Sequence, residues 1–210
     1  VDMNLFQNLG SWPDRTFWRH RLFGLLIMIA AMPALSGCTG AAVGAGAAAG
    51  VAAFEERTIG TVADDAKIAA QIRLAIMDRG PDYALKIGIE VFEGRVLLTG
   101  LVPTENMRAE AVRKSWGISG VRDVLNEIQI SSGSLIGTAR DAWISAQLTT
   151  RLAMDEKIYS INYVIETVNG VVYLLGIAQN QKELDRVIAH SRNLKYVRKV
   201  ISHARLKNPA

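Results

Sequence analysis

The spacing of hydrophobic and polar positions follows the same order twice along the chain. Shifting the sequence by 76 residues aligns residues 64–130 with residues 140–206 without a gap. The offset stays constant through the pairs Tyr83/Tyr159, Gly94/Gly170, Gly100/Gly176 and Val124/Val200. A constant offset of this length predicts a structural unit that occurs twice.

Each copy opens with the periodicity of an amphipathic helix. Apolar side chains four residues apart form one stripe, made of Ile68, Ile72 and Ile76 in the first copy and of Ile144, Leu148 and Leu152 in the second. A second helix is predicted over residues 104–116 and 180–194. Thr104 and Asn180 are the predicted N-caps, because their side-chain oxygens can accept hydrogen bonds from the first helical turn.

Strands are predicted between and after these helices. Apolar and other residues alternate over 87–92 and 161–168, which predicts a strand in each copy. The dipeptides Glu93-Gly94 and Asn169-Gly170 follow, and Asn-Gly is typical of a two-residue hairpin turn. The returning strands are predicted over 96–98 and 171–175, and the closing strands over 121–130 and 197–204.

The order of elements in each copy is therefore αββαβ, and the predicted fold class is α+β. Each copy is expected to form a three-stranded sheet with two helices on one face. A unit of about 65–70 residues has a marginal core, so the two copies are expected to support each other. The stretch Ser131-Ser132-Gly133-Ser134 is a predicted linker between them.

The N-terminal segment has the layout of a secretory signal. Arg15, Arg19 and Arg21 precede an uncharged apolar run over residues 22–31, which is too short for a stable membrane span. The run leads to Leu35-Ser36-Gly37-Cys38, which resembles the bacterial lipobox. That resemblance implies cleavage before Cys38 and acylation of this cysteine. The alternative is an ordinary signal peptide followed by a stray buried cysteine.

The lipobox, the repeat and the linker give the expected boundaries along the chain. We divide it into a signal peptide (1–37), Cys38 with a Gly/Ala-rich tether (38–63), the first copy (64–130), a linker (131–138), the second copy (139–206) and a tail (207–210). Several acyl chains hold a protein stably on a membrane, whereas one chain holds it weakly. Thr39, rather than Asp, follows the cysteine. By resemblance to sorted lipoproteins, this implies the periplasmic face of the outer membrane.

Composition narrows the possible chemistry. A single cysteine excludes an internal disulfide and a Cys-based metal site, and the three histidines are far apart in the sequence. The net charge of +4 is too small for a dedicated binder of duplex DNA. We therefore expect no metal, no cofactor and no nucleic-acid partner.

Two pairs of recurring carboxylates are the strongest candidates for acid–base chemistry. Glu90 and Glu166 occupy matched strand positions, and Asp65 and Asp141 occupy matched positions near a helix start. An aspartate at a helix start satisfies free N–H groups and the helix dipole, which favours a structural role. With no nucleophile triad or phosphate-binding loop, the sequence favours a protein that is not an enzyme.

The copies differ in charge. Residues 64–130 carry nine basic and ten acidic side chains, whereas residues 139–210 carry eleven and six. A basic residue near an anionic bilayer contributes about 1 kcal/mol of binding. The second copy is therefore the better candidate for contact with anionic lipid, although an ordinary solvated basic face has the same composition.

Trp143 is the main candidate for membrane contact. It lies about 100° around the helix from Ile144, and its matched residue in the first copy is Lys67. An indole on the surface suits a bilayer interface, where the ring is half buried and its N–H stays hydrated. The alternative is that Trp143 packs against the first copy or the linker.

Other side chains are expected to assist or to pack. Met154 lies on roughly the same side of the helix as Trp143, and Arg140, Arg151 and Lys157 are candidate head-group contacts. Trp116 ends a helix of the first copy and is expected in the core or between the copies. Tyr196 stands where the first copy has Gly120, directly before the closing strand.

The repeated unit resembles the BON domain. The segments that carry the resemblance are DDAKIAAQIRLAI, EVFEGRVLLTG and GVRDVLNEI in the first copy, and RDAWISAQLTTRL, ETVNGVVYLLG and YVRKVISHA in the second. Together with the lipobox, the layout resembles the dual-BON-domain outer-membrane lipoproteins. This resemblance implies binding of anionic phospholipid through the second domain, with Trp143 at the contact, and support of outer-membrane integrity. The alternative function is an adaptor for envelope proteins of the outer-membrane assembly or division machinery.

Overall fold

The computed structural model describes residues 55–131 and 137–208. Both copies of the repeat lie in one compact unit of the chain. The predicted signal peptide, Cys38 and most of the tether lie outside the described residues. Within the described ranges, no helix is both long and apolar enough to cross a membrane.

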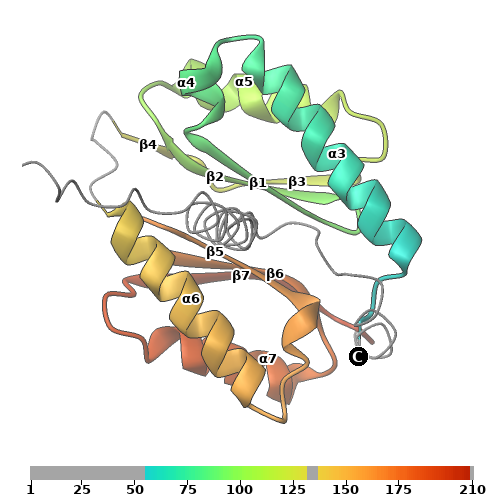
Figure 1. Cartoon of the computed structure of the whole chain (residues 1–210), viewed down its shortest axis with the longest axis vertical. Coiled ribbons are helices and arrows are strands. Elements are labelled where there is room, and N and C mark those ends of the chain that lie inside the picture. Colours follow the sequence, from blue (N-terminus) through green and yellow to red (C-terminus); the bar gives the residue numbers. More distant parts are fainter. Residues whose placement is uncertain (1–54, 132–136, 209–210) are drawn as a thin grey trace, which may run out of the picture. The chain divides into compact units, whose positions relative to one another are not determined.

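The first repeat consists of a mixed sheet covered by helices on one face (Figure 1). Its elements are α3 (Ile59–Met77), α4 (Pro81–Ala84), β1 (Ile87–Phe92), β2 (Arg95–Val102), α5 (Glu105–Trp116), β3 (Asp123–Asn126) and β4 (Gln129–Ile130). Strand β1 pairs antiparallel with β2, and both β3 and β4 pair parallel with β2. Helix α5 is the crossover that a parallel pair of strands requires.

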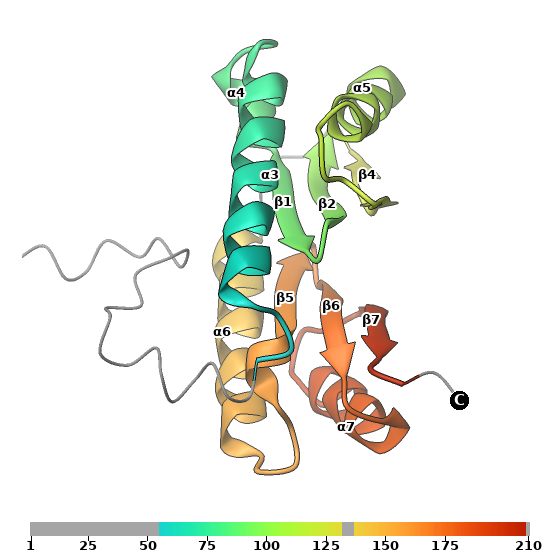
Figure 2. The ribbon, with the colours of Figure 1, turned by 90° about the vertical axis from the view of Figure 1, so that its right-hand side faces the viewer.

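The second repeat has the same order of elements. They are α6 (Thr138–Met154), the 3₁₀-helix η1 (Ser160–Asn162), β5 (Tyr163–Val168), β6 (Val171–Ala178), α7 (Gln181–Arg192) and β7 (Lys199–Leu206). Strand β5 pairs antiparallel with β6, and β6 pairs parallel with β7. Figure 2 shows the hairpins β1–β2 and β5–β6 in side view. The α+β class and the αββαβ order are thus confirmed, with three strands in the second repeat and four, β4 included, in the first.

Several boundaries differ from the predictions. The returning strands β2 and β6 continue past their predicted ends to Val102 and Ala178, and η1 occupies the start of the predicted strand 161–168. Helix α3 begins at Ile59, inside the segment expected to be tether, because the Thr58 hydroxyl caps it by accepting from the Thr61 N–H at 3.2 Å. The closing strand of the first repeat is broken into β3 and β4. At the break, Asn126 Oδ1 accepts from the N–H of Ile128, whose side chain turns into the core. The predicted caps are confirmed, since Thr104 and Asn180 each accept a hydrogen bond from the first turn of their helix.

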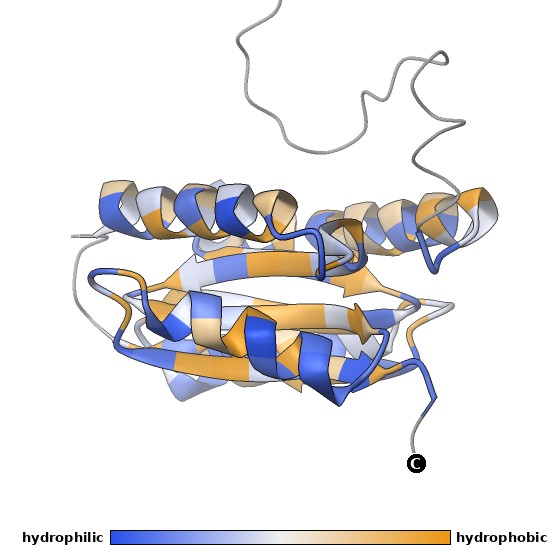
Figure 3. Ribbon diagram, turned by 90° about the horizontal axis from the view of Figure 1, so that it is seen from below, coloured by the Kyte–Doolittle hydropathy of each residue, from blue (hydrophilic) through white to orange (hydrophobic). Residues whose placement is uncertain are grey.

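Each repeat has its own apolar core between its helices and its sheet. The predicted stripes of α3 and α6 are buried, and they pack on alternate residues of the strands, such as Val96 and Leu98 in β2. Figure 3 shows polar and apolar colours alternating along the helices, whereas the strands are mostly apolar. This pattern is expected when a helix buries one stripe and a central strand buries both faces.

A third apolar cluster joins the two sheets on the faces that the helices leave free. It contains Phe92 and Leu97 from the first repeat and Val171, Tyr173, Leu175 and Ile177 from the second. Polar contacts surround it: His203 Nε2 lies 2.9 Å from Glu127 Oε1, and the Gln129 amide donates to the Tyr173 hydroxyl at 3.0 Å. The expected mutual support of the two small units therefore takes the form of a shared core.

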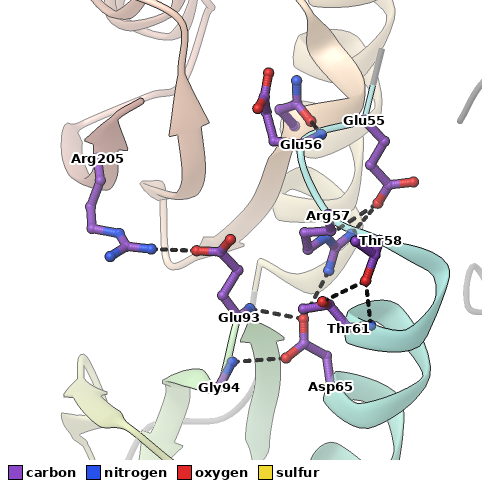
Figure 4. Close-up of polar contacts among 10 residues, drawn as sticks. Glu55, Glu56, Arg57, Thr58, Thr61, Asp65, Glu93, Gly94 and Arg205 are labelled. Carbon is purple, nitrogen blue, oxygen red and sulfur yellow. Dashed lines mark hydrogen bonds and ion pairs between the residues drawn. The ribbon is translucent and has the colours of Figure 1, made fainter. Parts of the chain in front are cut away.

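The matched aspartates hold the hairpin turns. Asp141 lies in the first turn of α6, as predicted, whereas α3 begins earlier than expected and Asp65 is not at its start. Asp65 is buried in the second turn of α3, and its carboxylate accepts from the Glu93 and Gly94 N–H groups at 2.8 Å each (Figure 4). Asp141 binds the turn of the second repeat in the same way, at 2.7 and 2.8 Å. These turns place two successive residues at positive φ, so their N–H groups have no ladder partner and need an acceptor.

Candidate functional site

Trp143 lies on the surface of α6, next to a core residue. Its side chain is 42% exposed, whereas the neighbouring Ile144 is fully buried. Successive residues of an α-helix point about 100° apart, so the burial of Ile144 directs the indole away from the core. The indole is therefore a large aromatic group that the fold of the second repeat leaves partly in contact with solvent.

Tyr196 meets this indole from the other end of the repeat. It lies in the loop of residues 193–198 between α7 and β7, and it is 47% exposed. The two ring centroids are 6.0 Å apart and the ring planes cross at 73°, which is an edge-to-face contact. Such aromatic pairs contribute about 0.5–1.5 kcal/mol beyond the area they bury.

Two cationic groups lie against the Tyr196 ring. The guanidinium carbon of Arg140 is 5.0 Å from the ring centroid, and the ammonium nitrogen of Lys195 is 4.8 Å from it. Hydrogen bonding to Lys195 and the charges of Lys195 and Arg140 lower the pKa of the Tyr196 hydroxyl. We call Trp143, Tyr196, Arg140 and Lys195 the aromatic–cationic patch.

The patch belongs to the second repeat alone. The positions matched to Arg140, Trp143, Lys195 and Tyr196 in the first repeat are Asp64, Lys67, Ser119 and Gly120. All four residues of the patch are therefore absent from the first repeat, although the two repeats share one fold. Since the fold forms without these side chains at the matched positions, the patch is a surface feature added to a common scaffold.

The three other predicted lipid-contact residues lie at or just after the C-terminal end of α6. Met154 ends the helix and is 78% exposed, while Arg151 and Lys157 are also exposed. At 1.5 Å of rise per residue, Met154 is about 16 Å along the helix from Trp143. The structure thus brings Arg140 to the indole, and it places Arg151 and Met154 at the end of the same helix and Lys157 in the turn after it, all outside the patch.

The expectation for Trp116 is wrong. This residue is 52% exposed, and it is neither in the core nor between the repeats. The buried residues of α5 include Ala111 and Ser115. Trp116 follows Ser115 by one position and therefore points about 100° away from the buried face.

The matched glutamates form a coupled pair with perturbed acidity. Burial, together with the charges of the Glu90 and Asp141 carboxylates, raises the pKa of Glu166 to about 7. Burial also raises the pKa of Glu90, against the charge of Arg73. The described residues contain no group of three or more His, Cys, Asp or Glu side chains that could hold a metal ion.

Sequence reasoning missed Lys195 and Tyr196 as members of the site. In the sequence, Tyr196 is visible only as a departure from the glycine of the first copy, and Lys195 is one of the eleven basic residues of 139–210. A signal was present, because each patch residue differs in chemical type from its counterpart. Reading those differences as one site required knowledge that residues 140–143 and 195–196 lie side by side.

Comparisons with known proteins agree with this architecture. The BON domain model matches residues 64–132 and 140–208. An "Uncharacterized protein in gshII 5'region" of Anaplasma centrale is 45% identical over 147 residues, which cover 69% of this chain and 96% of that protein.

Two named relatives match over most of their length. "Outer membrane lipoprotein DolP" of Haemophilus influenzae is 31% identical, covering 84% of this chain and 92% of the relative. "Osmotically-inducible protein Y" of Escherichia coli is 26% identical, covering 71% and 76%. From the two domain matches and these relatives, we conclude that the chain belongs to the BON-domain family and carries two BON domains in tandem.

Proposed function

We propose that the protein is a lipid-anchored binding protein of the bacterial envelope, without enzymatic activity, whose second BON domain contacts anionic phospholipid through the aromatic–cationic patch. The anchor is the acylated Cys38, and the location is the periplasmic face of the outer membrane. The lipobox-like leader and the similarity to a relative named as an outer-membrane lipoprotein support this location. In this role the protein supports the integrity of the outer membrane.

The observation that carries the proposal is the patch itself. A half-exposed indole is poorly solvated in water and is well suited to the bilayer interface, where its N–H stays hydrated. Arg140 and Lys195 lie beside the indole's aromatic partner, at 5.0 and 4.8 Å from the ring centroid of that partner. Each basic group near an anionic surface contributes about 1 kcal/mol, so two of them add about 2 kcal/mol to the free energy of membrane binding.

Vesicle co-sedimentation tests this function. The soluble fragment is residues 45–210, which form a compact unit and contain both BON domains. We expect it to pellet with phosphatidylglycerol vesicles and not with phosphatidylcholine vesicles.

Trp143→Ala is expected to lower the partition coefficient at least tenfold. Trp116→Ala is the matched control, because it removes an indole of similar exposure from the first domain, and it is expected to pellet like wild type. Equal pelleting of the Trp143 variant and wild type would refute the proposal.

The second candidate is a protein-binding adaptor with the same anchor. Trp, Tyr and Arg are the residue types enriched at interface hot spots, and all three occur in the patch. A photo-crosslinking residue at position 143 in living cells separates the two functions. Lipid adducts support phospholipid contact, whereas one dominant protein adduct supports the adaptor.

A further inference from the structure

The backbone of Tyr196 adopts a conformation that disfavours a bulky side chain. Its φ is +72°. Among the described residues, the other non-glycine residues with positive φ are Glu93 and Asn169, each in a hairpin turn that requires this conformation. Positive φ outside such a turn is a genuine outlier for a bulky residue, and it strains the backbone.

The fold requires this conformation and does not let it relax. In the first domain the matched residue is Gly120, with φ of +93°. In both domains the carbonyl of this residue packs on the second residue of the hairpin turn. A Cβ atom added at Gly94 would lie 2.6 Å from the Gly120 oxygen, and one added at Gly170 would lie 3.0 Å from the Tyr196 oxygen. Glycine therefore suits this position, and the second domain carries tyrosine despite the strain.

Stabilisation of the fold does not account for the tyrosine. Nearly half of its side chain is exposed, and its described ring contacts are Trp143, Arg140 and Lys195, which are the other members of the patch. An observed backbone outlier supports a hypothesis of function when its side chain serves a surface site. Here the strained residue is the one that touches every other member of that site.

We propose that Tyr196 is a positioning residue of the phospholipid-binding patch, which orients the Trp143 indole and holds Arg140 and Lys195 level with it. This inference rests on the proposed function. The edge-to-face contact restricts the indole to one orientation, and the two cation–ring contacts hold flexible side chains beside it. Less side-chain entropy is then lost when the surface meets a bilayer, so binding is tighter.

Two substitutions in the 45–210 fragment test the role of the ring. Tyr196→Gly removes the ring and the strain together, and Tyr196→Phe keeps the ring and removes the hydroxyl. With Tyr196→Gly we expect a melting temperature no lower than that of wild type, and a three- to tenfold weaker partition onto phosphatidylglycerol vesicles. With Tyr196→Phe we expect a partition within twofold of wild type.

The possible outcomes distinguish failure of this inference from failure of the proposed function. If Tyr196→Gly partitions like wild type while Trp143→Ala is impaired, Tyr196 is not a positioning residue and the lipid function stands. If Tyr196→Gly loses both thermal stability and binding, the tyrosine is structural and the inference is overturned. Loss of binding by Tyr196→Phe shows that the hydroxyl rather than the ring is needed, which also overturns it. If Trp143→Ala partitions like wild type, the proposed function itself fails.

Discussion

Replacement of Glu166 by glutamine is expected to stabilise the protein at neutral and alkaline pH and to have little effect in acid. Glu166 lies in β5, largely buried, with the carboxylates of Glu90 in β1 and Asp141 in α6 acting on it. The charge of Arg73 in α3 offsets part of the rise in the pKa of Glu90. A neutral amide of the same shape removes the charge that burial disfavours.

The magnitude follows from the pKa of Glu166, which rises from 4.5 to about 7 in the folded protein. A carboxyl group whose pKa is higher in the folded state favours folding at a pH below its pKa in the unfolded state. This contribution is lost as the pH rises through its pKa in the folded state. One pKa unit corresponds to about 1.4 kcal/mol, so full ionisation opposes folding by about 3 kcal/mol before solvent screening and by about 2 kcal/mol after it. The effect of Glu166 on the free energy of unfolding therefore changes between pH 4.5 and about 7.

Urea unfolding of the 45–210 fragment from pH 4 to pH 8.5 measures this effect. The free energy of unfolding of Glu166→Gln should exceed that of wild type by about 2 kcal/mol at pH 8, and the difference should vanish near pH 4. Glu156→Gln is the control, because Glu156 is an exposed carboxylate of the same domain. A difference that is constant with pH, or absent at pH 8, would show that Glu166 does not carry the burial penalty.

Two further substitutions test the structural roles assigned above. Asp141→Asn leaves one oxygen to accept from two turn N–H groups, so we expect a loss of about 1–2 kcal/mol in the free energy of unfolding. Asp185→Asn is the control and should be neutral, because the carboxylate of Asp185 is exposed. Gly100→Ala places a Cβ atom 2.0 Å from the Lys86 carbonyl oxygen at φ of +119°, so we expect a loss of more than 2 kcal/mol, measured by thermal or urea unfolding. A near-neutral Gly100 variant would show that β1 shifts freely to accommodate the methyl group.

The predicted elements were mostly confirmed where the signal is local. Helix caps, the hairpin turns and the apolar stripes each depend on residues within about eight positions of one another, so their pattern is visible in the sequence. The leader, Cys38 and the boundary between the domains stay predictions, because they fall in or beside residues that the structure does not describe.

The errors arose where the deciding contact is distant in sequence. Asp65 appeared to serve a helix start, but its carboxylate reaches the turn 28 residues later. The break in the closing strand of the first domain depends on Ile128 reaching the core. Trp116 was misplaced for a different reason, since the burial of Ser115, a polar residue, is not visible in the sequence pattern.

The sequence alone determined a duplicated αββαβ unit and a difference in charge between its copies, because periodicity and composition are properties of the chain itself. The tertiary structure decided which side chains meet. Trp143 and Tyr196 are 53 residues apart in sequence, and they become neighbours because α6 packs over the hairpin turn and the loop before β7 lies against the same turn. Only folding brings these two segments together, so only the structure shows that an indole, a strained tyrosine and two cations form one surface.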